Sequence, residues 1–267
     1  MKLSISNIAW DKDQNEDVFN LIKQYKFSGI EIAPTKVFKN PKKATFDEVD
    51  LFRKFVSKHQ LIIPAMQSLL YGKPHLNIFN KYPETVSYLK RMIHIANILE
   101  IRVLVFGSPK NRYLSNMSSK DGYNKAVSFF EEVADHALKN NVVFCIEPNS
   151  KEYGCNFINT TLEGIQIVKD VNSSGFGLHL DSAIMSLNKE DMQNSISKAI
   201  PYMKHFHISE PFLEPIINKK VDHKKIFKIL KKNNYNRWVS IEMKKTESNN
   251  LDSIKSSLSY ISNLYKL

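Results

Sequence analysis

The chain has 267 residues, of which 42% are hydrophobic and 24% are charged, and its formal net charge at pH 7 is +11. This composition excludes a disordered or fibrous protein, and the length suits one domain with a sizeable core. A basic chain would suit nucleic acid, but Arg supplies only 5 of the 38 basic residues, and Arg is the better side chain for phosphate and base recognition. We therefore expect no nucleic-acid partner.

The sequence predicts neither a membrane segment nor a cysteine-based site. No run of about 18 apolar residues occurs, so we expect no membrane partner. The opening MKLSISNIAW lacks the long apolar stretch of a secretory signal and reads as a strand, which favours a cytoplasmic location. Cys145 and Cys155 are too few for a disulfide scaffold and match no metal-binding spacing.

Eight short apolar runs alternate with longer amphipathic segments along the chain. These runs predict strands over 3–9, 29–34, 62–70, 103–108, 142–148, 176–181, 203–209 and 239–243. Strands this apolar are buried on both faces, as parallel strands are. Helix-start signals lie between the strands, at Thr45, at Pro83 and Glu84, at Thr160 and Thr161, and at Asp222.

Eight strand-helix units predict an α/β protein, a single-domain (β/α)8 TIM barrel that spans residues 1–267. Such a barrel typically takes about 250 residues. An open doubly wound sheet would commonly show five or six strands and a Gly-rich phosphate turn, whereas neither GxGxxG nor GxxxxGK[ST] is present. No linker or low-complexity tract divides the chain.

Four polar side chains each close a predicted strand: Glu147 in FCIEPN, Asp181 in GLHLDS, His207 in KHFHIS and Glu242 in VSIEMK. They lie 34, 26 and 35 positions apart, about one strand-helix unit each, so a closed barrel gathers them at one end. Any one alone is more often a cap, a surface charge or a core histidine, but several buried carboxylates without a cation would be costly. The set predicts one divalent cation, with Mn²⁺, Mg²⁺ or Co²⁺ preferred and Zn²⁺ still open.

Two further histidines share strand faces with these residues. Because side chains alternate along a strand, His179 lies on the face of Asp181, and His205 lies on the face of His207. We expect both to lie one layer deeper in the barrel and to orient ligands or substrate from below.

The strings IEIAP, IEPN, GLHLD, HFHISE and VSIEM, in this order, resemble the xylose isomerase-like barrel superfamily. The closer resemblance is to the branch of sugar-phosphate isomerases and epimerases that includes the ketose 3-epimerases and hydroxypyruvate isomerase, and it spans essentially the whole chain. It implies that Glu147, Asp181, His207 and Glu242 bind one divalent cation, with Glu147 and Glu242 on opposite sides of a bound sugar. Members of this branch are commonly homodimers or homotetramers, and the oligomeric state of this chain stays open.

This placement suits the movement of a proton next to a carbonyl. When a hydroxycarbonyl sugar chelates the cation, one carboxylate can remove the acidified proton to give a cis-enediolate, and the other can return a proton. Return to the same carbon from the opposite face is epimerisation, and return to the neighbouring carbon is isomerisation. We predict a metal-dependent sugar isomerase or epimerase with Glu147 and Glu242 as catalytic residues.

Three positions depart from the ketose epimerase pattern. Ile184 stands three residues after Asp181, where those enzymes place a His, and Leu213 stands six residues after His207, where they place an Arg. Tyr153 replaces a second Glu. These changes argue against free fructose or tagatose as the substrate, and less strongly against sugars whose phosphate would need that Arg.

Other residues near the strand ends are candidates for substrate contact. Trp10 would offer an apolar platform for a sugar face, or would plug the barrel mouth, and Glu31 would bind hydroxyls or pair with a Lys in the interior. The predicted substrate contacts are Trp10, Glu31, Gln67, Asn149, Tyr153, His179 and Glu210.

Two other activities fit parts of the pattern. A metal-dependent dehydratase or lyase acting on an inosose or dehydroshikimate-like ring would use the same enolate chemistry. A DNA-repair phosphodiesterase of the endonuclease IV type would share the barrel, but it needs a multinuclear zinc cluster and more His ligands. Predicted strands two to four end instead in Glu31, Gln67 and Ser108. A non-catalytic binding protein is disfavoured because all four cation ligands are present.

Overall fold

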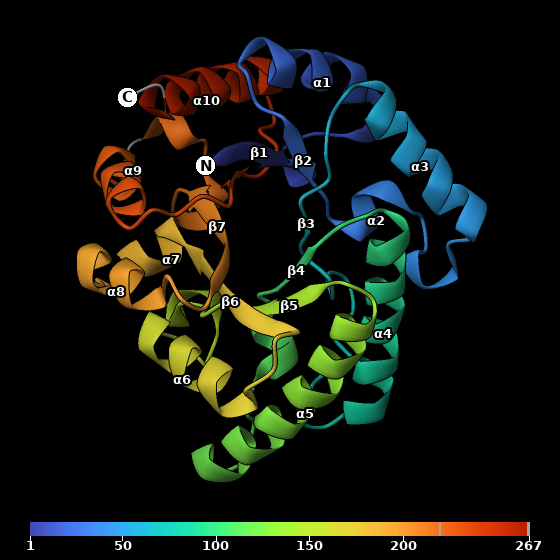
Figure 1. Cartoon of the computed structure of the whole chain (residues 1–267), viewed down its shortest axis with the longest axis vertical. Coiled ribbons are helices and arrows are strands. Elements are labelled where there is room, and N and C mark those ends of the chain that lie inside the picture. The colour runs from blue at the N-terminus through green and yellow to red at the C-terminus, as the bar shows by residue number, and fades with distance from the viewer. Residues whose placement is uncertain (219, 266–267) are drawn as a thin grey trace.

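The computed structural model describes residues 1–218 and 220–265. Within these residues, eight parallel strands form one sheet in the order β2-β1-β8-β7-β6-β5-β4-β3, with helices arranged around it (Figure 1). Parallel bridges from Gly29 to Ile62 and from Ile32 to Met66 join the two edges of this sheet into a nearly closed barrel. The predicted (β/α)8 TIM barrel is confirmed.

Each predicted apolar run overlaps one strand. The strands are β1 (Lys2–Ser6), β2 (Gly29–Glu31), β3 (Ala65–Met66), β4 (Val103–Phe106), β5 (Val143–Ile146), β6 (Phe176–Asp181), β7 (Met203–Ser209) and β8 (Trp238–Glu242). β1 ends before residue 9 because a 3-10 turn, Asn7–Ala9, follows it, and the Asn7 side chain accepts a hydrogen bond from the backbone N–H of Ala33. β3 is shorter than the predicted 62–70 because Ser68 has a positive φ of 53°, which turns the chain out of the sheet.

Three helices begin at the caps that the sequence predicts, and α4 begins at Tyr82, one residue before the predicted Pro83. Thr45 and Thr160 each form a capping box at the start of α3 and α6, and the Asp222 side chain caps α9. The helices are α1 (Asn15–Gln24), α2 (Pro34–Val37), α3 (Phe46–Lys58), α4 (Tyr82–Ile98), α5 (Ser119–Lys139), α6 (Thr161–Val171), α7 (Ser182–Leu187), α8 (Met192–Ala199), α9 (His223–Lys232) and α10 (Asn250–Tyr265). No helix in the described part of the chain is both long enough and apolar enough to span a membrane.

Aromatic side chains fill the layer between α5 and the strands that it covers. Phe130 of α5 stacks on Phe176 of β6, with ring centroids 4.9 Å apart, and meets Phe106 of β4 edge-on at 5.9 Å. All three rings are buried. This layer fixes α5 against β4, β5 and β6. Glu147 directly follows β5, and Asp181 ends β6.

Replacing Phe130 by Ala should lower the free energy of unfolding by about 3–5 kcal/mol, because it removes a fully buried ring and leaves a cavity. Leu138 lies on the same helix with 49% of its surface exposed, so Leu138→Ala is a matched control that should change stability by less than about 0.5 kcal/mol. Urea denaturation followed by circular dichroism measures both. Equal losses in the two variants would contradict the assigned packing.

Candidate active site

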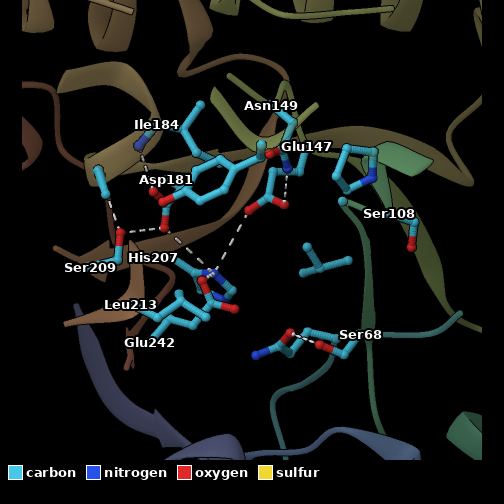
Figure 2. Close-up of a pocket in the computed structure, with 16 residues that line it drawn as sticks. Ser68, Ser108, Glu147, Asn149, Asp181, Ile184, His207, Ser209, Leu213 and Glu242 are labelled. Carbon is cyan, nitrogen blue, oxygen red and sulfur yellow. Dashed lines mark hydrogen bonds and ion pairs between the residues drawn. The ribbon is translucent and has the colours of Figure 1, made fainter. Parts of the chain in front are cut away.

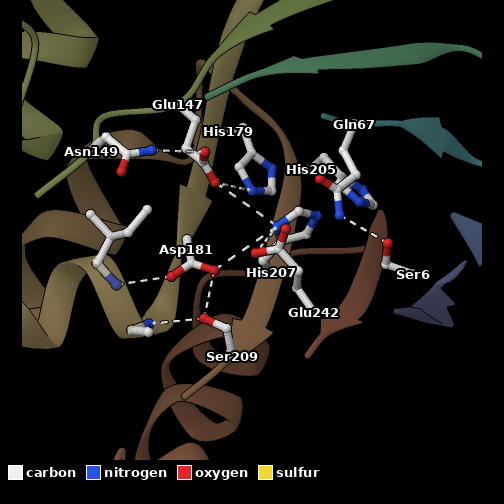
Figure 3. A network of polar contacts seen from close by, with 12 residues as sticks. Ser6, Gln67, Glu147, Asn149, His179, Asp181, His205, His207, Ser209 and Glu242 are labelled. Atoms are coloured by element: carbon white, nitrogen blue, oxygen red, sulfur yellow. Dashed lines mark hydrogen bonds and ion pairs between the residues drawn. The ribbon is translucent and has the colours of Figure 1, made fainter. Parts of the chain in front are cut away.

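The barrel brings the four strand-end residues together around one imidazole nitrogen. Glu147 follows β5, Asp181 and Glu242 end β6 and β8, and His207 lies within β7, directly opposite Asp181 in the sheet register. His207 Nδ1 lies 3.4 Å from Glu242 Oε2 and 3.9 Å from both Glu147 Oε1 and Asp181 Oδ2 (Figures 2 and 3). Three acidic groups and one imidazole therefore converge at the carboxyl ends of the strands.

These carboxylates are little exposed to solvent, with exposed side-chain fractions of 10% for Glu147, 3% for Asp181 and 14% for Glu242. Burial and the negative charges of Glu242 and Asp181 raise the pKa of Glu147 well above its usual value. Burial and the charge of Glu242 raise the pKa of Asp181 to about 6. The three groups thus destabilise one another as anions, and a positive charge between them would relieve this cost.

His207 is held from below by Glu31. Its Nε2 atom lies 2.9 Å from Glu31 Oε2, and both side chains are fully buried. Burial opposes the charge on Glu31, but the nearby His207 and His205 outweigh it and hold the pKa of Glu31 well below its usual value. Burial opposes the charge on His207, but Glu31 and Glu242 outweigh it and hold the pKa of His207 well above its usual value. With Nε2 donating to Glu31, a cation that displaced the Nδ1 proton would meet the lone pair of Nδ1 facing the three carboxylates, where Nδ1 makes no well-formed hydrogen bond. A buried unpaired nitrogen among three carboxylate oxygens is the donor set of a divalent cation, and a carboxylate behind the histidine is a common support.

Neighbouring groups fix the orientation of two of the carboxylates. Asp181 Oδ2 accepts a hydrogen bond of 2.5 Å from the Ser209 hydroxyl, and its Oδ1 accepts one of 2.8 Å from the N–H of Ile184 at the start of α7. Glu147 Oε2 accepts a hydrogen bond of 3.1 Å from the Asn149 amide, which leaves Oε1 facing His207. Figure 3 shows these contacts around the imidazole.

His179 and His205 form a deeper layer beneath the carboxylates. His179 Nε2 lies 3.3 Å from Glu147 Oε1, and His205 Nε2 lies 3.4 Å from Glu31 Oε2. Burial lowers the pKa of both imidazoles, and the charge of Glu31 opposes this shift at each of them. Within the described residues, two sets lie close enough to hold a cation: Glu147, Asp181 and His207, and His179, His205 and His207.

A cavity of about 250 Å³ opens above the carboxylates. Of the residues predicted to contact substrate, Gln67, Asn149 and Tyr153 line it. The Gln67 amide donates to the Ser6 hydroxyl at 2.9 Å, and the Tyr153 hydroxyl accepts the N–H of Phe212 at 2.8 Å. The chain therefore presents these polar groups at the cavity in fixed orientations.

The other predicted substrate contacts do not line this cavity. Trp10 is 1% exposed in the hydrophobic core, where its indole N–H donates to Asn15. Glu210 is fully buried and accepts hydrogen bonds from His223 Nε2 and from the N–H groups of residues 220 and 221. Glu31 lies beneath His207, and His179 faces Glu147 from below. His179 therefore lies one layer below the carboxylates, as strand alternation predicts. Trp10, Glu31 and Glu210 each have a hydrogen-bond partner away from the cavity.

Two residues of the site have no place in the sequence prediction. Ser209 orients Asp181, and it lies two residues after His207 on β7, so strand alternation places both on one face. Arg112 is fully buried, and its Nη2 donates to the backbone carbonyl of Glu147 at 2.8 Å. Arg112 ends the short 3-10 helix Pro109–Arg112 between β4 and α5, where four residues are too few for a periodic pattern to indicate the direction of the side chain.

A family model described as a xylose isomerase-like TIM barrel matches residues 19–264. The chain belongs to this family. Over 254 residues it is 25% identical to a probable ketose 3-epimerase from Synechocystis sp., covering 91% of this chain and 84% of that relative. It is 26% identical to an L-ribulose 3-epimerase from Methylomonas sp. over 47% of this chain and 43% of that relative. These relatives are epimerases, in agreement with the prediction of an enzyme.

Solved structures with low sequence identity share the fold. The 3-keto-D-glucoside 4-epimerase of E. coli superposes with a TM-score of 0.83 at 14% identity, with 100% of both chains covered. A D-psicose 3-epimerase from Clostridium cellulolyticum gives a TM-score of 0.82 at 16% identity, with 100% of this chain and 98% of the other covered. At these identities the structural similarity shows a shared barrel fold and does not show a shared activity.

Replacing Glu31 by Gln should weaken the binding of Mn²⁺ by about 10- to 100-fold, although Glu31 lies behind His207 rather than among the converging carboxylates. The Gln side-chain oxygen can still accept a hydrogen bond from the Nε2–H of His207, but Gln has no negative charge to raise the basicity of the imidazole. Isothermal titration calorimetry with Mn²⁺ measures the affinity, and Glu247→Gln, at an exposed position in the loop after β8, is the control. Unchanged affinity in Glu31→Gln would contradict the support assigned to Glu31.

Proposed function

We propose that the protein is a divalent-cation-dependent epimerase or isomerase of a sugar or sugar derivative. The observation that carries the proposal is the convergence of three nearly buried carboxylates within 3.9 Å of His207 Nδ1, at the floor of a cavity. The sequence relatives that are ketose and ribulose 3-epimerases support the same reaction class.

Glu147, Asp181, His207 and Glu242 would hold the cation. Oxygen-rich ligation with one imidazole suits Mn²⁺, Mg²⁺ or Co²⁺, and also permits Zn²⁺. The cation supplies Lewis acidity that polarises the carbonyl of a bound ketose and acidifies the neighbouring C–H.

Glu147 and Glu242 are the two groups that move the proton. They reach the cavity from β5 and β8, and Figure 2 shows their carboxylates entering it from different strands. With a ketose between them, one carboxylate takes the proton from the carbon beside the carbonyl, which leaves an enediolate. The other group starts in its protonated form, delivers its proton to the opposite face of that carbon and becomes a carboxylate, and the configuration at the carbon is inverted.

The alternative activities have less support. An endonuclease IV-type centre needs further imidazoles at the cavity, but among the described residues β3 and β4 lead into Gln67 and Ser108, and Glu31 of β2 lies beneath His207. A ring dehydratase would use the same carboxylates. A probable 3-DHS dehydratase from Bacillus anthracis shares the fold with a TM-score of 0.76, but at 15% identity this likeness does not extend to activity.

Proton exchange with solvent tests the proposal. Mn²⁺-loaded protein in D₂O, incubated with a panel of ketoses and followed by NMR, should incorporate deuterium at the carbon beside the carbonyl of its substrate. EDTA should abolish the exchange. No exchange with any ketose or cyclic polyol ketone, together with cleavage of an abasic-site duplex, would overturn the proposal in favour of a nuclease.

Replacing either Glu147 or Glu242 by Gln should lower the exchange rate by about 10²- to 10⁴-fold, because a positioned acid or base contributes about that factor. Circular dichroism should show that both variants keep the fold. Glu152→Gln is the matched control, because Glu152 lies on the exposed turn just beyond Glu147 and is absent from the cavity lining. Full exchange activity in either active-site variant would contradict the two-carboxylate mechanism.

A further inference from the structure

The cavity has two unlike walls on either side of the carboxylates. Figure 2 shows Ser68 and Ser108 on one side, and Ile184 and Leu213 on the other. The first wall carries the hydroxyl groups of Ser68 and Ser108. The Ser68 hydroxyl donates a hydrogen bond to the amide oxygen of the adjacent Gln67. The second wall is built from aliphatic side chains of α7 and of the 3-10 turn Pro211–Leu213.

The aliphatic wall offers little to a hydroxyl group. The backbone N–H of Ile184 is already committed to Asp181, and the N–H of Leu213 donates to the carbonyl of Glu210 at 3.0 Å. The Tyr153 hydroxyl on this side is turned to the backbone N–H of Phe212. A hydroxyl placed here would lose its water without a full set of partners, which is unfavourable.

The backbone that positions Leu213 is held in an uncommon conformation. Phe212 and Leu213 have positive φ values of 62° and 58°, although neither is Gly. Residues in this region need a surrounding structure that enforces them, and such residues cluster at functional sites. Here the Tyr153 hydroxyl holds Phe212, and the carbonyl of Leu213 accepts the N–H of Lys244 at 2.8 Å. The turn therefore places an aliphatic side chain at the cavity by specific contacts.

The cavity is also unsuited to a phosphate group. Among the described residues, those that line it include three acidic side chains and neither Lys nor Arg. A phosphate group inside this cavity would bring further negative charge to carboxylates that already destabilise one another, and no residue that lines the cavity offers it a cation. Lys73 and Lys110 line a separate pocket beyond Ser68 and Ser108.

We propose that the substrate is a deoxyketose, whose hydroxyls face Ser68 and Ser108 and whose terminal methyl group packs against Ile184 and Leu213. This inference rests on the proposed function and narrows it to one substrate class. The methyl group fills the aliphatic wall without burying an unpaired hydroxyl. Since an apolar pocket rejects an added hydroxyl only modestly, the preference over the parent ketose is about 10- to 100-fold.

Matched pairs of sugars test the preference. Deuterium exchange with Mn²⁺-loaded protein is compared for 6-deoxy-L-fructose against L-fructose and for 6-deoxy-D-fructose against D-fructose, which differ only at the terminal carbon. We expect kcat/KM to be about 10- to 100-fold higher for the deoxy member of the accepted pair. Equal or faster exchange of the parent ketose would overturn the inference and leave the proposed function standing. Exchange with no ketose at all would overturn both.

A substitution in the aliphatic wall tests whether Leu213 itself sets the preference for a terminal methyl group. Leu213→Asn brings an amide to the cavity, and Asn tolerates the left-handed backbone that Leu213 occupies. It should reduce the preference for the deoxyketose at least fivefold, chiefly through kcat/KM for the parent sugar. Leu138→Asn, at an exposed site on α5, should keep the wild-type preference. An unchanged preference in Leu213→Asn would contradict the assigned role of Leu213, and the wild-type comparison stands even if this variant misfolds.

Discussion

The repulsion among three nearly buried carboxylates around His207 is the constraint on which the site depends. Glu147, Asp181 and Glu242 lie within 3.9 Å of the same nitrogen atom, and burial raises the pKa values of Glu147 and Asp181. Such an arrangement is costly without a cation, because the interior of a protein solvates charge poorly. Glu31 below the imidazole adds a fourth negative charge and fixes which nitrogen faces the carboxylates.

The barrel makes this arrangement possible because parallel strands end at one face. β5, β6, β7 and β8 are neighbours in the sheet, so residues distant in the sequence meet at adjacent strand ends. The loops beyond the strands give the two sides of the cavity different side chains. The turn Pro211–Leu213 turns an aliphatic side chain inward, while Ser68 and Ser108 bring hydroxyl groups from the other side (Figure 2). The strands thus carry the chemistry, and the loops set what the cavity accepts.

The fold and the convergence of four residues could be predicted because both follow from local periodicity. Apolar runs locate the strands, and spacing of one strand-helix unit places Glu147, Asp181, His207 and Glu242 at one face. Strand alternation also predicted the deeper layer of His179 and His205. The depth of a single residue at a strand end could not be predicted in the same way, since it depends on strand register and tilt. Glu31 ends β2 in the sequence, yet its carboxylate lies beneath His207, where it meets Nε2 of both His205 and His207. Trp10 and Glu210 pair with residues nearby in the sequence, Asn15 and His223, but the apolar periodicity does not show these side-chain hydrogen bonds.

A crystal structure of the protein grown with Mn²⁺, with an anomalous difference map recorded at the manganese edge, would locate the cation directly. We expect a single strong peak in contact with His207 Nδ1 and with oxygen atoms of Glu147, Asp181 and Glu242. A peak among His179, His205 and His207 instead, which form the other set close enough to bind a cation, would contradict it. So would several peaks at the barrel mouth, because a multinuclear centre belongs to a different chemistry.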